Sequence, residues 1–513
     1  MKKLLSIILI LSLVLFAVSS CGTDVPDNNE NGGNENGTNE GGNTDTHVHE
    51  YNRKKPAKAF VNTVATCTKA GVYYYSCACG ACGTETFTDT ALSPCKYENG
   101  SCVWCGAVEP SETDGLVYSS IKNGEAFMVT GYNGTAVEVY IPSYHEGKPV
   151  LRITGYAFRE NTAITSVIVG DNVFAIDNNA FADCTNLERV VIGSGVETIG
   201  ECAFGWCASL KSVNLPDSLT TIEKSAFWMC SGLTEIRIPY GVTAIGEEAF
   251  GRCDGLTEIN VPDSVESIAR KAFYWCIKLE KINVDADNAK YTSKDGVLYN
   301  KDMTTVIQYP TGSKNTDFAI PETVTTIGYY AFSCSENLKN LTIPNSVNKV
   351  EYYAFGEVSG FNYNNKGGLL YLGNESNPYL YLAGVESKSI ESATVASGCK
   401  FVGDYAFSFC THLTGVSFEE NSQLISIGNN AFFYCGALES VVIPASAKLL
   451  NSPFYACTSL KSVTFDDGAN WYVTENHDTY CNPVDGVLVD TSNSATNATC
   501  FAETYSGQCW YKK

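Results

Sequence analysis

Apolar residues alternate with polar ones in short runs that return through most of the chain. In one such run, Val213 and Leu215 are separated by the polar residue Asn214. This alternation predicts a short strand with one apolar face. Pro216 follows directly, and because proline has no N–H to donate, it ends the strand. The chain is therefore expected to contain many short strands, each with one side buried.

The pair Ala-Phe shows that these runs belong to a repeat. Between Ala157 and Ala272 the pair returns every 23 residues, and later copies are spaced less evenly. The copies begin at Ala157, Ala180, Ala203, Ala226, Ala249, Ala272, Ala331, Ala354, Ala406 and Ala431, with a degenerate copy at Pro453-Phe454. A unit of this length cannot cover its own apolar face, so neighbouring units must stack. The pattern predicts a repeat solenoid built mainly of β-structure.

The complete unit resembles a known family. One unit contains, in order, Leu210-x-x-Val213-x-Leu215-Pro216, Leu219-x-x-Ile222 and Ala226-Phe227-x-x-Cys230. Such units with a 23-residue period resemble the BspA-like leucine-rich repeats of bacterial surface lipoproteins, over about residues 150–465. The resemblance implies a leucine-rich-repeat solenoid over residues 111–466. It also implies a role in attachment to host matrix proteins or to neighbouring bacteria.

A cysteine follows most of the repeated phenylalanines by three residues. These cysteines are Cys184, Cys207, Cys230, Cys253, Cys276, Cys410, Cys435 and Cys457, and Cys334 stands one place early. Leucine-rich repeats place Asn or Cys at a buried turn, where a thiol behaves as a small apolar group. We expect these thiols to be buried and unreactive, rather than to form a metal-binding or redox ladder.

Two stretches interrupt the period, and we interpret them as insertions near residues 285–320 and 358–400. In the first, two β-rich runs flank Asn300-Lys301-Asp302, which predicts a hairpin extruded from the solenoid. The second contains the apolar runs 367–372 and 379–382. Loops that interrupt a repeat often carry function, although irregular coils are the simpler interpretation.

Candidate ligand-binding residues lie at the outward positions of the predicted strands. They are Arg189, Glu235, Arg237, Glu258, Asn260, Lys281 and Asn283. Their mixed charges suit a protein or glycan surface better than a lipid groove. Trp206 and Trp275 add an aromatic column two residues after the phenylalanine. Such rings stack on sugars and anchor protein interfaces, but packing within the turn is the alternative.

The first residues predict export and anchoring. A positive start, an apolar run from Leu4 to Ala17 and small residues before Cys21 are typical of a signal peptide over residues 1–20. Val18-Ser19-Ser20-Cys21 resembles the lipobox of bacterial lipoproteins, which implies that Cys21 carries the lipid. Residues 21–46 are rich in Asn, Gly and Glu and are expected to form a disordered tether. The expected location is the outer surface of the cell envelope.

Two further segments flank the repeat. Residues 47–110 contain Cys79-x-x-Cys82 and Cys102-x-x-Cys105, and four thiolates in two such pairs suit a tetrahedral structural zinc site. Disulfides in an exported protein are the alternative. Residues 467–513 fall outside the period, and we expect them to cap the last coil, since solenoids need an end cap.

Charge and motifs narrow the possible functions. The net charge is −22, which argues against nucleic acid as a partner. The chain has no Gly-rich phosphate loop, Gly-x-Ser-x-Gly or His-Glu-x-x-His motif, so we expect no enzymatic activity. The favoured hypothesis is a surface lipoprotein that binds an extracellular protein in adhesion. The alternatives are a glycan-binding lipoprotein for nutrient capture and a structural envelope scaffold.

Overall fold

The computed structural model describes two compact units, residues 1–111 and 112–513. Described are residues 110–358, 360–474, 486–501 and 507–512, and earlier in the chain only the backbone of five short strands. The predicted signal peptide with Cys21, the tether, Cys79 and Cys105 lie outside these residues. No helix in the part of the chain that the structure describes has the length and apolar character needed to cross a membrane.

The first unit contributes five strands. They are β1 (Val61–Thr63), β2 (Gly71–Ser76), β3 (Cys82–Asp89), β4 (Tyr97–Glu98) and β5 (Ser101–Cys102). The first three form an antiparallel sheet, and β4 pairs with β5. Cys82 begins β3 and Cys102 ends β5, but their side chains lie outside the described part. The zinc site therefore stays a prediction.

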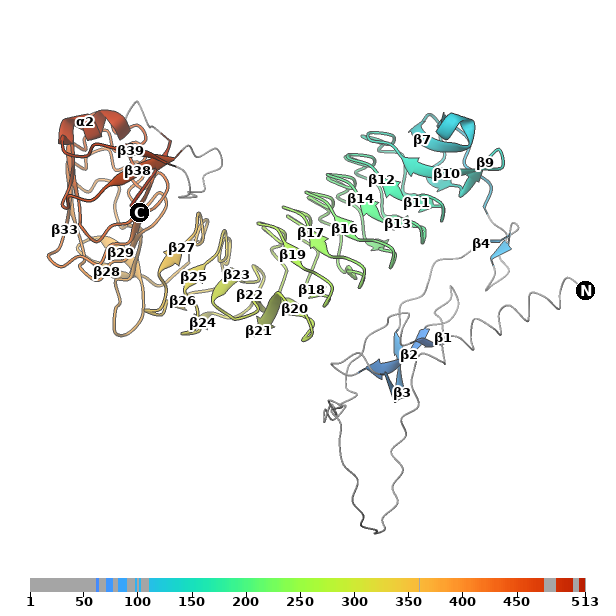
Figure 1. Cartoon of the computed structure of the whole chain (residues 1–513), viewed down its shortest axis with the longest axis horizontal. Helices are drawn as coiled ribbons and strands as arrows, with labels where there is room; N and C mark the ends of the chain where they lie inside the picture. Colours follow the sequence, from blue (N-terminus) through green and yellow to red (C-terminus); the bar gives the residue numbers. More distant parts are fainter. Residues whose placement is uncertain are drawn as a thin grey trace, which may run out of the picture. The chain divides into compact units, whose positions relative to one another are not determined.

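The second unit is a solenoid in which most coils contribute one strand to each of two sides. We call the Leu-x-x-Val-x-Ile side the front sheet (Figure 1). Its strands are β8 (Glu138–Ile141), β11 (Ser166–Val169), β13 (Arg189–Val191), β15 (Ser212–Asn214), β18 (Glu258–Val261), β20 (Lys281–Val284), β24 (Asp317–Ala319), β26 (Asn340–Thr342), β31 (Ser392–Val395), β33 (Gly415–Phe418), β35 (Ser440–Ile443) and β37 (Ser462–Phe465).

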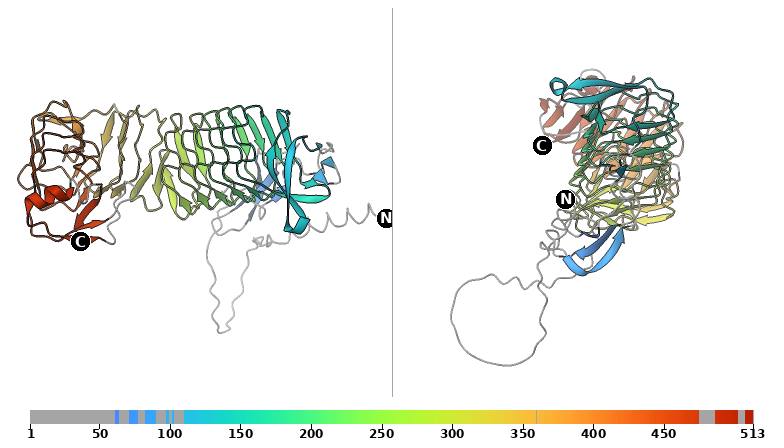
Figure 2. Two further views of the ribbon diagram at one scale, coloured as in Figure 1. Left: turned by 90° about the horizontal axis from the view of Figure 1, so that it is seen from above. Right: turned by 90° about the vertical axis from the view of Figure 1, so that its right-hand side faces the viewer.

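The opposite side, which we call the return sheet, carries the Leu-x-x-Ile motif. Its parallel strands are β10 (Lys148–Ile153), β12 (Ala175–Ile176), β14 (Thr198–Ile199), β16 (Thr221–Ile222), β17 (Ala244–Ile245), β19 (Ser267–Ile268), β23 (Thr305–Gln308), β25 (Thr326–Ile327), β27 (Lys349–Val350), β30 (Tyr381–Val385), β32 (Phe401–Val402), β34 (Ser426–Ile427) and β36 (Leu449–Asn451). Equivalent residues of successive coils face each other, as Ile199 faces Ile222, so the 23-residue period becomes a stack of coils (Figure 2).

The repeated phenylalanines fill the space between the sheets. Phe181, Phe204, Phe227 and Phe250 are fully buried. Their ring centroids are 5.3–5.5 Å apart and their planes differ by only 2–6°. Because each ring packs against its copies in the neighbouring coils, no coil can bury its phenylalanine alone. This confirms the predicted solenoid.

The burial predicted for the repeat cysteines is confirmed. The Cys230 thiol donates to the carbonyl of Phe204 at 3.1 Å, and Cys253 donates to the carbonyl of Phe227 at 3.2 Å. The thiol thus ties each turn to the preceding coil. Burial also raises the pKa of the Cys184 and Cys276 thiols to about 12, which keeps both protonated at neutral pH.

The backbone of each turn carries a feature that the sequence pattern did not predict. The residue before Ala-Phe and the residue two places after it both have positive φ, as at Ser225 (53°) and Met229 (59°). Each costs a non-glycine residue about 1 kcal/mol. Bonds between coils offset this cost, because the Phe227 N–H donates to Ala249 O at 2.8 Å and Met229 N–H to Gly251 O at 2.9 Å.

The insertions start new segments of the return sheet. Strands β21 (Tyr291–Lys294) and β22 (Val297–Asn300) form an antiparallel hairpin, and β22 continues antiparallel into β23, which pairs parallel with β25. The hairpin predicted around Asn300-Lys301-Asp302 is therefore confirmed as β22 and β23, but the prediction that it is extruded from the solenoid is wrong. Pairing within the sheet satisfies backbone groups that an extruded hairpin would leave at an open edge.

The same arrangement occurs at two other places. Strands β28 (Asn364–Lys366) and β29 (Leu369–Leu372) precede β30, which pairs parallel with β32. At the start of the solenoid, β6 (Leu116–Ile121) and β7 (Ala126–Tyr132) precede β10; the helical turn η2 (Lys122–Gly124) joins them, and β9 (Tyr144–His145) pairs with β10. We name the resulting segments the first block (116–284), the second block (291–356) and the third block (363–474).

Antiparallel strands also follow the last coil. They are β38 (Trp471–Thr474), β39 (Val487–Val489) and β40 (Cys509–Lys512), with the short helix α2 (Ser494–Thr499). Strand β40 pairs with both β36 and β38, and the rings of Trp471 and Trp510 are fully buried. Cys509 is disulfide-bonded, whereas Cys500 is free. These residues cover the apolar interior beyond the last repeat.

Candidate functional site

The front sheet positions most of the predicted polar residues in columns. Glu258 on β18 faces Lys281 on β20, and Asn260 faces Asn283. Glu258, Asn260 and Lys281 are exposed, and Asn283 is half-buried. Arg189 on β13 is also exposed, between strands β11 and β15. The structure therefore brings the four residues of β18 and β20 together and leaves Arg189 in a separate part of the sheet.

Several of these side chains bond to each other between coils. The Asn283 amide donates to Glu258 Oε1 at 2.6 Å and to Asn260 Oδ1 at 3.0 Å. The Arg189 guanidinium donates to Ser166 Oγ at 3.1 Å. A partner would have to share or replace these bonds. This patch can support specificity, but it is a weaker anchor than an unbonded surface.

Glu235 and Arg237 lie outside the regular sheet. Residues 232–239 form no assigned strand, so the front sheet is interrupted between β15 and β18. Ile236 and Ile238 are still buried, and Arg237 lies 3.9 Å from the carboxylate of Asp217. The prediction of a continuous strand column is wrong here, because the apolar positions are kept while the backbone pairing is not.

The two predicted tryptophans lie on the turns that lead into the front sheet. Trp206 is 37% exposed, whereas Trp275 is half-buried and has the Arg252 guanidinium 4.5 Å above its ring. Both have positive φ. The structure thus separates these rings from the polar columns, and Trp206 is the more exposed of the two.

A longer aromatic surface runs along the same turns. The rings of Tyr274, Tyr330, Tyr353 and Tyr405 follow one another with centroids 4.9–6.0 Å apart, and Phe433 continues the row at 6.1 Å. We call this row, together with its neighbours Tyr455, Phe409 and Tyr434, the turn ridge. It extends from the end of the first block across the second and third blocks.

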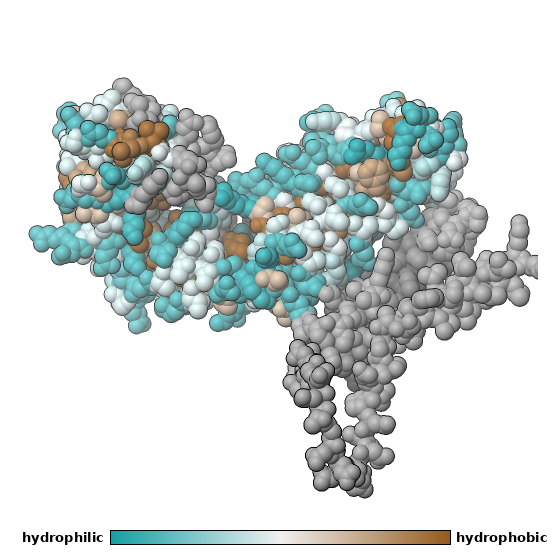
Figure 3. Space-filling view, in the orientation of Figure 1, coloured by the Kyte–Doolittle hydropathy of each residue, from teal (hydrophilic) through white to brown (hydrophobic). Residues whose placement is uncertain are grey.

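The ridge has cationic and exposed parts. The Lys271 ammonium lies 4.9 Å from the ring centroid of Tyr330. In the third block Phe409, Tyr434 and Tyr455 are 49–55% exposed, and the rings of Phe409 and Tyr434 stack at 5.6 Å. On the face shown in Figure 3, apolar side chains form small groups within a largely hydrophilic surface. Exposed aromatic groups of this kind mark interaction sites.

Five residues of this ridge follow a repeated phenylalanine by one or two places, and the other three stand before Ala-Phe. Tyrosine stands directly before Ala-Phe at Tyr156, Tyr330, Tyr353 and Tyr405. The predicted aromatic column follows the phenylalanine and therefore does not include these tyrosines. Their position has positive φ in each case, which turns the side chain onto the turn surface rather than into the core, as their partial exposure shows.

Comparison with known proteins places the repeat in a family. The model of the BspA type leucine rich repeat region matches in six copies, over residues 151–292, 309–376 and 385–506, which is more than half of the chain. No curated protein matches the chain.

Solved bacterial structures show similar chains. A leucine rich cell surface protein from Faecalibacterium prausnitzii is 25% identical, with a TM-score of 0.44, over 70% of this chain and 96% of that one. A leucine-rich repeat protein from Eubacterium ventriosum is 24% identical, with a TM-score of 0.42, over 69% and 83%. The pneumococcal vaccine antigen PcpA is 18% identical, with a TM-score of 0.49, over 70% and 93%.

Proposed function

Because the chain belongs to the BspA-type leucine-rich-repeat family, we propose that it is a surface lipoprotein that binds an extracellular protein. The observation that carries this proposal is the turn ridge, with its exposed rings at Phe409, Tyr434 and Tyr455. Aromatic side chains dominate the energy of protein interfaces, and clustered rings contribute more than scattered ones. Adhesion to host or neighbouring cells is the role that we propose for this binding.

We further propose that the protein does not act as an enzyme and that Cys21 anchors it to the cell envelope. The lipobox-like residues and the family of surface proteins support this location. Metabolic labelling with an alkyne fatty acid tests the anchor. We expect label in the wild-type protein and none in Cys21→Ala, while label in both would contradict the proposal.

A structural zinc ion held by Cys79, Cys82, Cys102 and Cys105 remains a proposal. Thiolates at this spacing suit zinc, and disulfides remain the alternative for an exported protein. Elemental analysis of the whole chain together with a count of free thiols distinguishes them. We expect one zinc per chain; no zinc and no free thiols among these four residues would favour disulfides.

A glycan ligand is the second candidate, favoured by one observation. The exposed, stacked rings of Phe409 and Tyr434 could accept a sugar face, since apolar sugar faces pack on aromatic rings. A protein ligand is preferred because the same ridge continues over six further aromatic residues and lies beside the cation of Lys271.

The test compares both ligand classes on one set of variants. The whole chain is applied to immobilised host matrix proteins and to a glycan array, alongside Phe409→Ala/Tyr434→Ala and the front-sheet control Lys281→Ala. We expect saturable binding to a matrix protein that weakens about tenfold or more in the ridge variant, as for loss of interface anchors. Binding that only Lys281→Ala weakens would move the site to the front sheet, and glycan binding alone would reverse the order of the candidates.

A further inference from the structure

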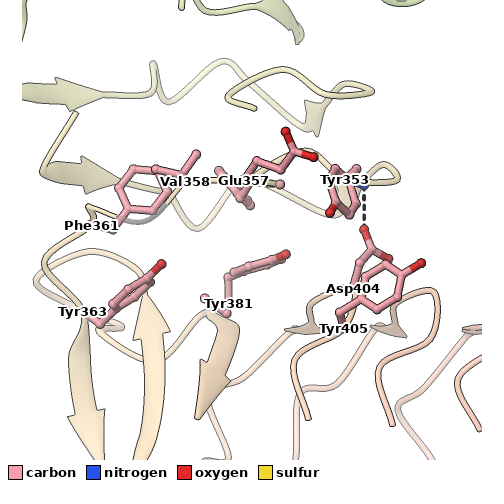
Figure 4. A pocket seen from close by; sticks show the side chains of 11 residues that line it. Tyr353, Glu357, Val358, Phe361, Tyr363, Tyr381, Asp404 and Tyr405 are labelled. Atoms are coloured by element: carbon pink, nitrogen blue, oxygen red, sulfur yellow. Dashed lines mark hydrogen bonds between the residues drawn. The ribbon is translucent and has the colours of Figure 1, made fainter. Parts of the chain in front are cut away.

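A small cavity lies where the second block meets the third block. Its volume is about 220 Å³, and eleven residues line it (Figure 4). Six of the lining residues are aromatic: Tyr353, Phe355, Phe361, Tyr363, Tyr381 and Tyr405. Figure 4 shows Tyr381 between the pair Phe361 and Tyr363 on one side and Asp404 and Tyr405 on the other. The cavity shares Tyr353 and Tyr405 with the turn ridge, but the exposed rings of Phe409, Tyr434 and Tyr455 do not line it.

A change in hydrogen bonding sets this junction apart from the regular turns. In a regular turn, the N–H before Ala-Phe donates to a backbone carbonyl of the next coil, as Ser225 N–H donates to Glu247 O at 2.8 Å. At the junction, the Tyr353 N–H donates instead to the Asp404 carboxylate at 2.6 Å (dashed line in Figure 4). The other carboxylate oxygen accepts from the Asn429 N–H at 2.5 Å. The Asp404 side chain thus accepts the bond that a backbone carbonyl accepts in a regular turn. Because the side chain extends from the backbone, it lies between the coil of Tyr353 and the coil of Asp404.

The aromatic rings are arranged edge to face. Phe355 and Tyr381 have centroids 4.7 Å apart with planes at 64°, and Tyr353 and Tyr405 are 6.0 Å apart at 87°. Phe361 is nearly perpendicular to both Phe355 and Tyr363. In the first block the repeated phenylalanines stack face to face instead, so their faces are covered. At the junction Phe355 still stacks on Phe332, with centroids 5.5 Å apart and planes at 23°, whereas its contacts with Phe361 and Tyr381 are edge to face.

Two glycines hold these rings in place. A Cβ atom on Gly356 would lie 1.9 Å from Cδ1 of Tyr353, and a Cβ on Gly403 would lie 2.4 Å from the hydroxyl of Tyr381. Any side chain at Gly356 would therefore displace the Tyr353 ring. The positions of the Tyr353 and Tyr381 rings at the junction therefore require glycine at both places.

The charge of the lining is entirely negative. Glu357 and Asp404 are its acidic residues, and none of the lining residues among those that the structure describes is basic. Glu357 is exposed and accepts a bond from the Cys334 thiol at 3.3 Å. Burial raises the pKa of Asp404 to about 6, so its carboxyl is largely ionised at neutral pH. The nearby Lys339 ammonium donates to the Glu336 carbonyl at 2.7 Å.

We propose that this cavity binds a small alkylammonium cation, either a free amine or the end of a lysine side chain. Ring faces attract cations, most strongly where the cation is removed from water, and the two carboxylates add attraction of the same sign. The volume is below the range of about 300–1,000 Å³ that is usual for drug-sized ligands. It suits an ammonium group with a few carbons rather than an oligosaccharide.

Calorimetric titration of the whole chain tests this proposal with defined probes. Tetramethylammonium and butylammonium chloride are compared with tert-butanol, a neutral compound of similar size, at constant ionic strength. We expect saturable binding of an ammonium probe with a Kd on the order of 1 mM and at least tenfold weaker binding of tert-butanol. Tighter binding of butylammonium identifies a lysine-like source, and tighter binding of tetramethylammonium identifies a methylated amine.

Two matched pairs of variants locate the binding. Glu357→Gln is compared with Glu160→Gln, which has the same turn position and also positive φ. Gly356→Ala is compared with Gly415→Ala, where a Cβ would meet nothing within 4 Å. We expect about tenfold weaker binding in the first member of each pair and no change in the second. Circular dichroism confirms that each variant is folded.

Three results would overturn the proposal. They are no saturable binding of either ammonium probe up to on the order of 10 mM, equal binding of tert-butanol, and equal affinities in both members of each pair. Because Glu357 is exposed, its substitution carries little risk to folding and keeps the test decisive if Gly356→Ala is unstable.

Discussion

The regular turns of the first block and the junction between the second and third blocks are built on the same Ala-Phe repeat, but they differ in hydrogen bonding and in ring packing. In the first block, Phe227 stacks parallel to its copies on both sides, and its N–H bonds to Ala249 O. At the junction, a carboxylate replaces a carbonyl and the rings meet edge to face. Exact repetition therefore gives a stable, closely packed interior. A departure from it at the junction creates a cavity lined by aromatic and acidic side chains.

The largest expected effect concerns the stacked core. Phe227→Ala should lower the free energy of unfolding by about 3–5 kcal/mol, because it removes a fully buried ring between two others. Phe355→Ala at the junction should cost less, since Phe355 is only half-buried. Urea unfolding of both variants measures the comparison. Equal losses would mean that the junction is packed as tightly as the first block.

The next effect is the pH dependence that the junction should add. Burial raises the pKa of Asp404 from 3.8 to about 6, so the folded chain binds a proton more tightly than the unfolded chain. This contribution to stability is about 3 kcal/mol when fully present, below about pH 4, and it is lost as pH rises through about 6. About 2 kcal/mol of it is lost between pH 4 and pH 6. The difference between the free energies of unfolding at pH 4 and at pH 6 should change by about 2 kcal/mol in Asp404→Asn, because this contribution is then missing. The same change in the exposed control Asp217→Asn would contradict the assignment.

A smaller effect is expected at the exposed turn positions. Trp206→Ala should change the free energy of unfolding by less than about 1 kcal/mol, because the ring is 37% exposed and lies on a turn. The same substitution should weaken ligand binding if Trp206 contributes to the surface. A loss of several kcal/mol in thermal or urea unfolding would instead assign Trp206 to the core.

The smallest expected effect is at the repeat thiols. Cys230 and Cys253 should not react with an aromatic disulfide reagent in the folded chain near neutral pH, because burial excludes the reagent and raises both thiol pKa values. Cys202 and Cys500 are half-buried and should react first. Peptide mapping after labelling identifies the sites, and early modification of Cys230 would show that the turns open.

Much of the fold could be predicted from the period alone. Each unit has an alternating strand, as around Val213, a proline that ends the strand, and an Ala-Phe pair. Such a unit can bury its apolar side chains only against the neighbouring coils. The positions of Phe227 and Cys230 in the interior follow from the same pattern, since one residue of each type per coil must stack with its equivalents.

The departures from the period could not be predicted in the same way. The bond from Tyr353 to Asp404 joins residues 51 positions apart, and nothing in the local pattern distinguishes Asp404 from other acidic residues in turns. The pairing of β23 with β25 depends on which sheet edge is open after Ile268, which is a property of the assembled coils. The ridge tyrosines were visible in the sequence, but their exposure depends on the positive φ of the turn.

The antiparallel hairpins that open each block have a mechanical consequence. Because β21 and β28 each begin a new sheet, backbone hydrogen bonding along the return side stops between β19 and β21 and again between β27 and β28. The front sheet is also interrupted there, between β20 and β24 and between β26 and β31. A tensile load along the array would be carried by side chains and by a few backbone bonds, such as Ile282 N–H to Gly296 O and Ile343 N–H to Gly373 O. Under such a load the three blocks would extend as separate segments joined end to end. The two junctions between blocks, one of which contains Asp404, would separate first.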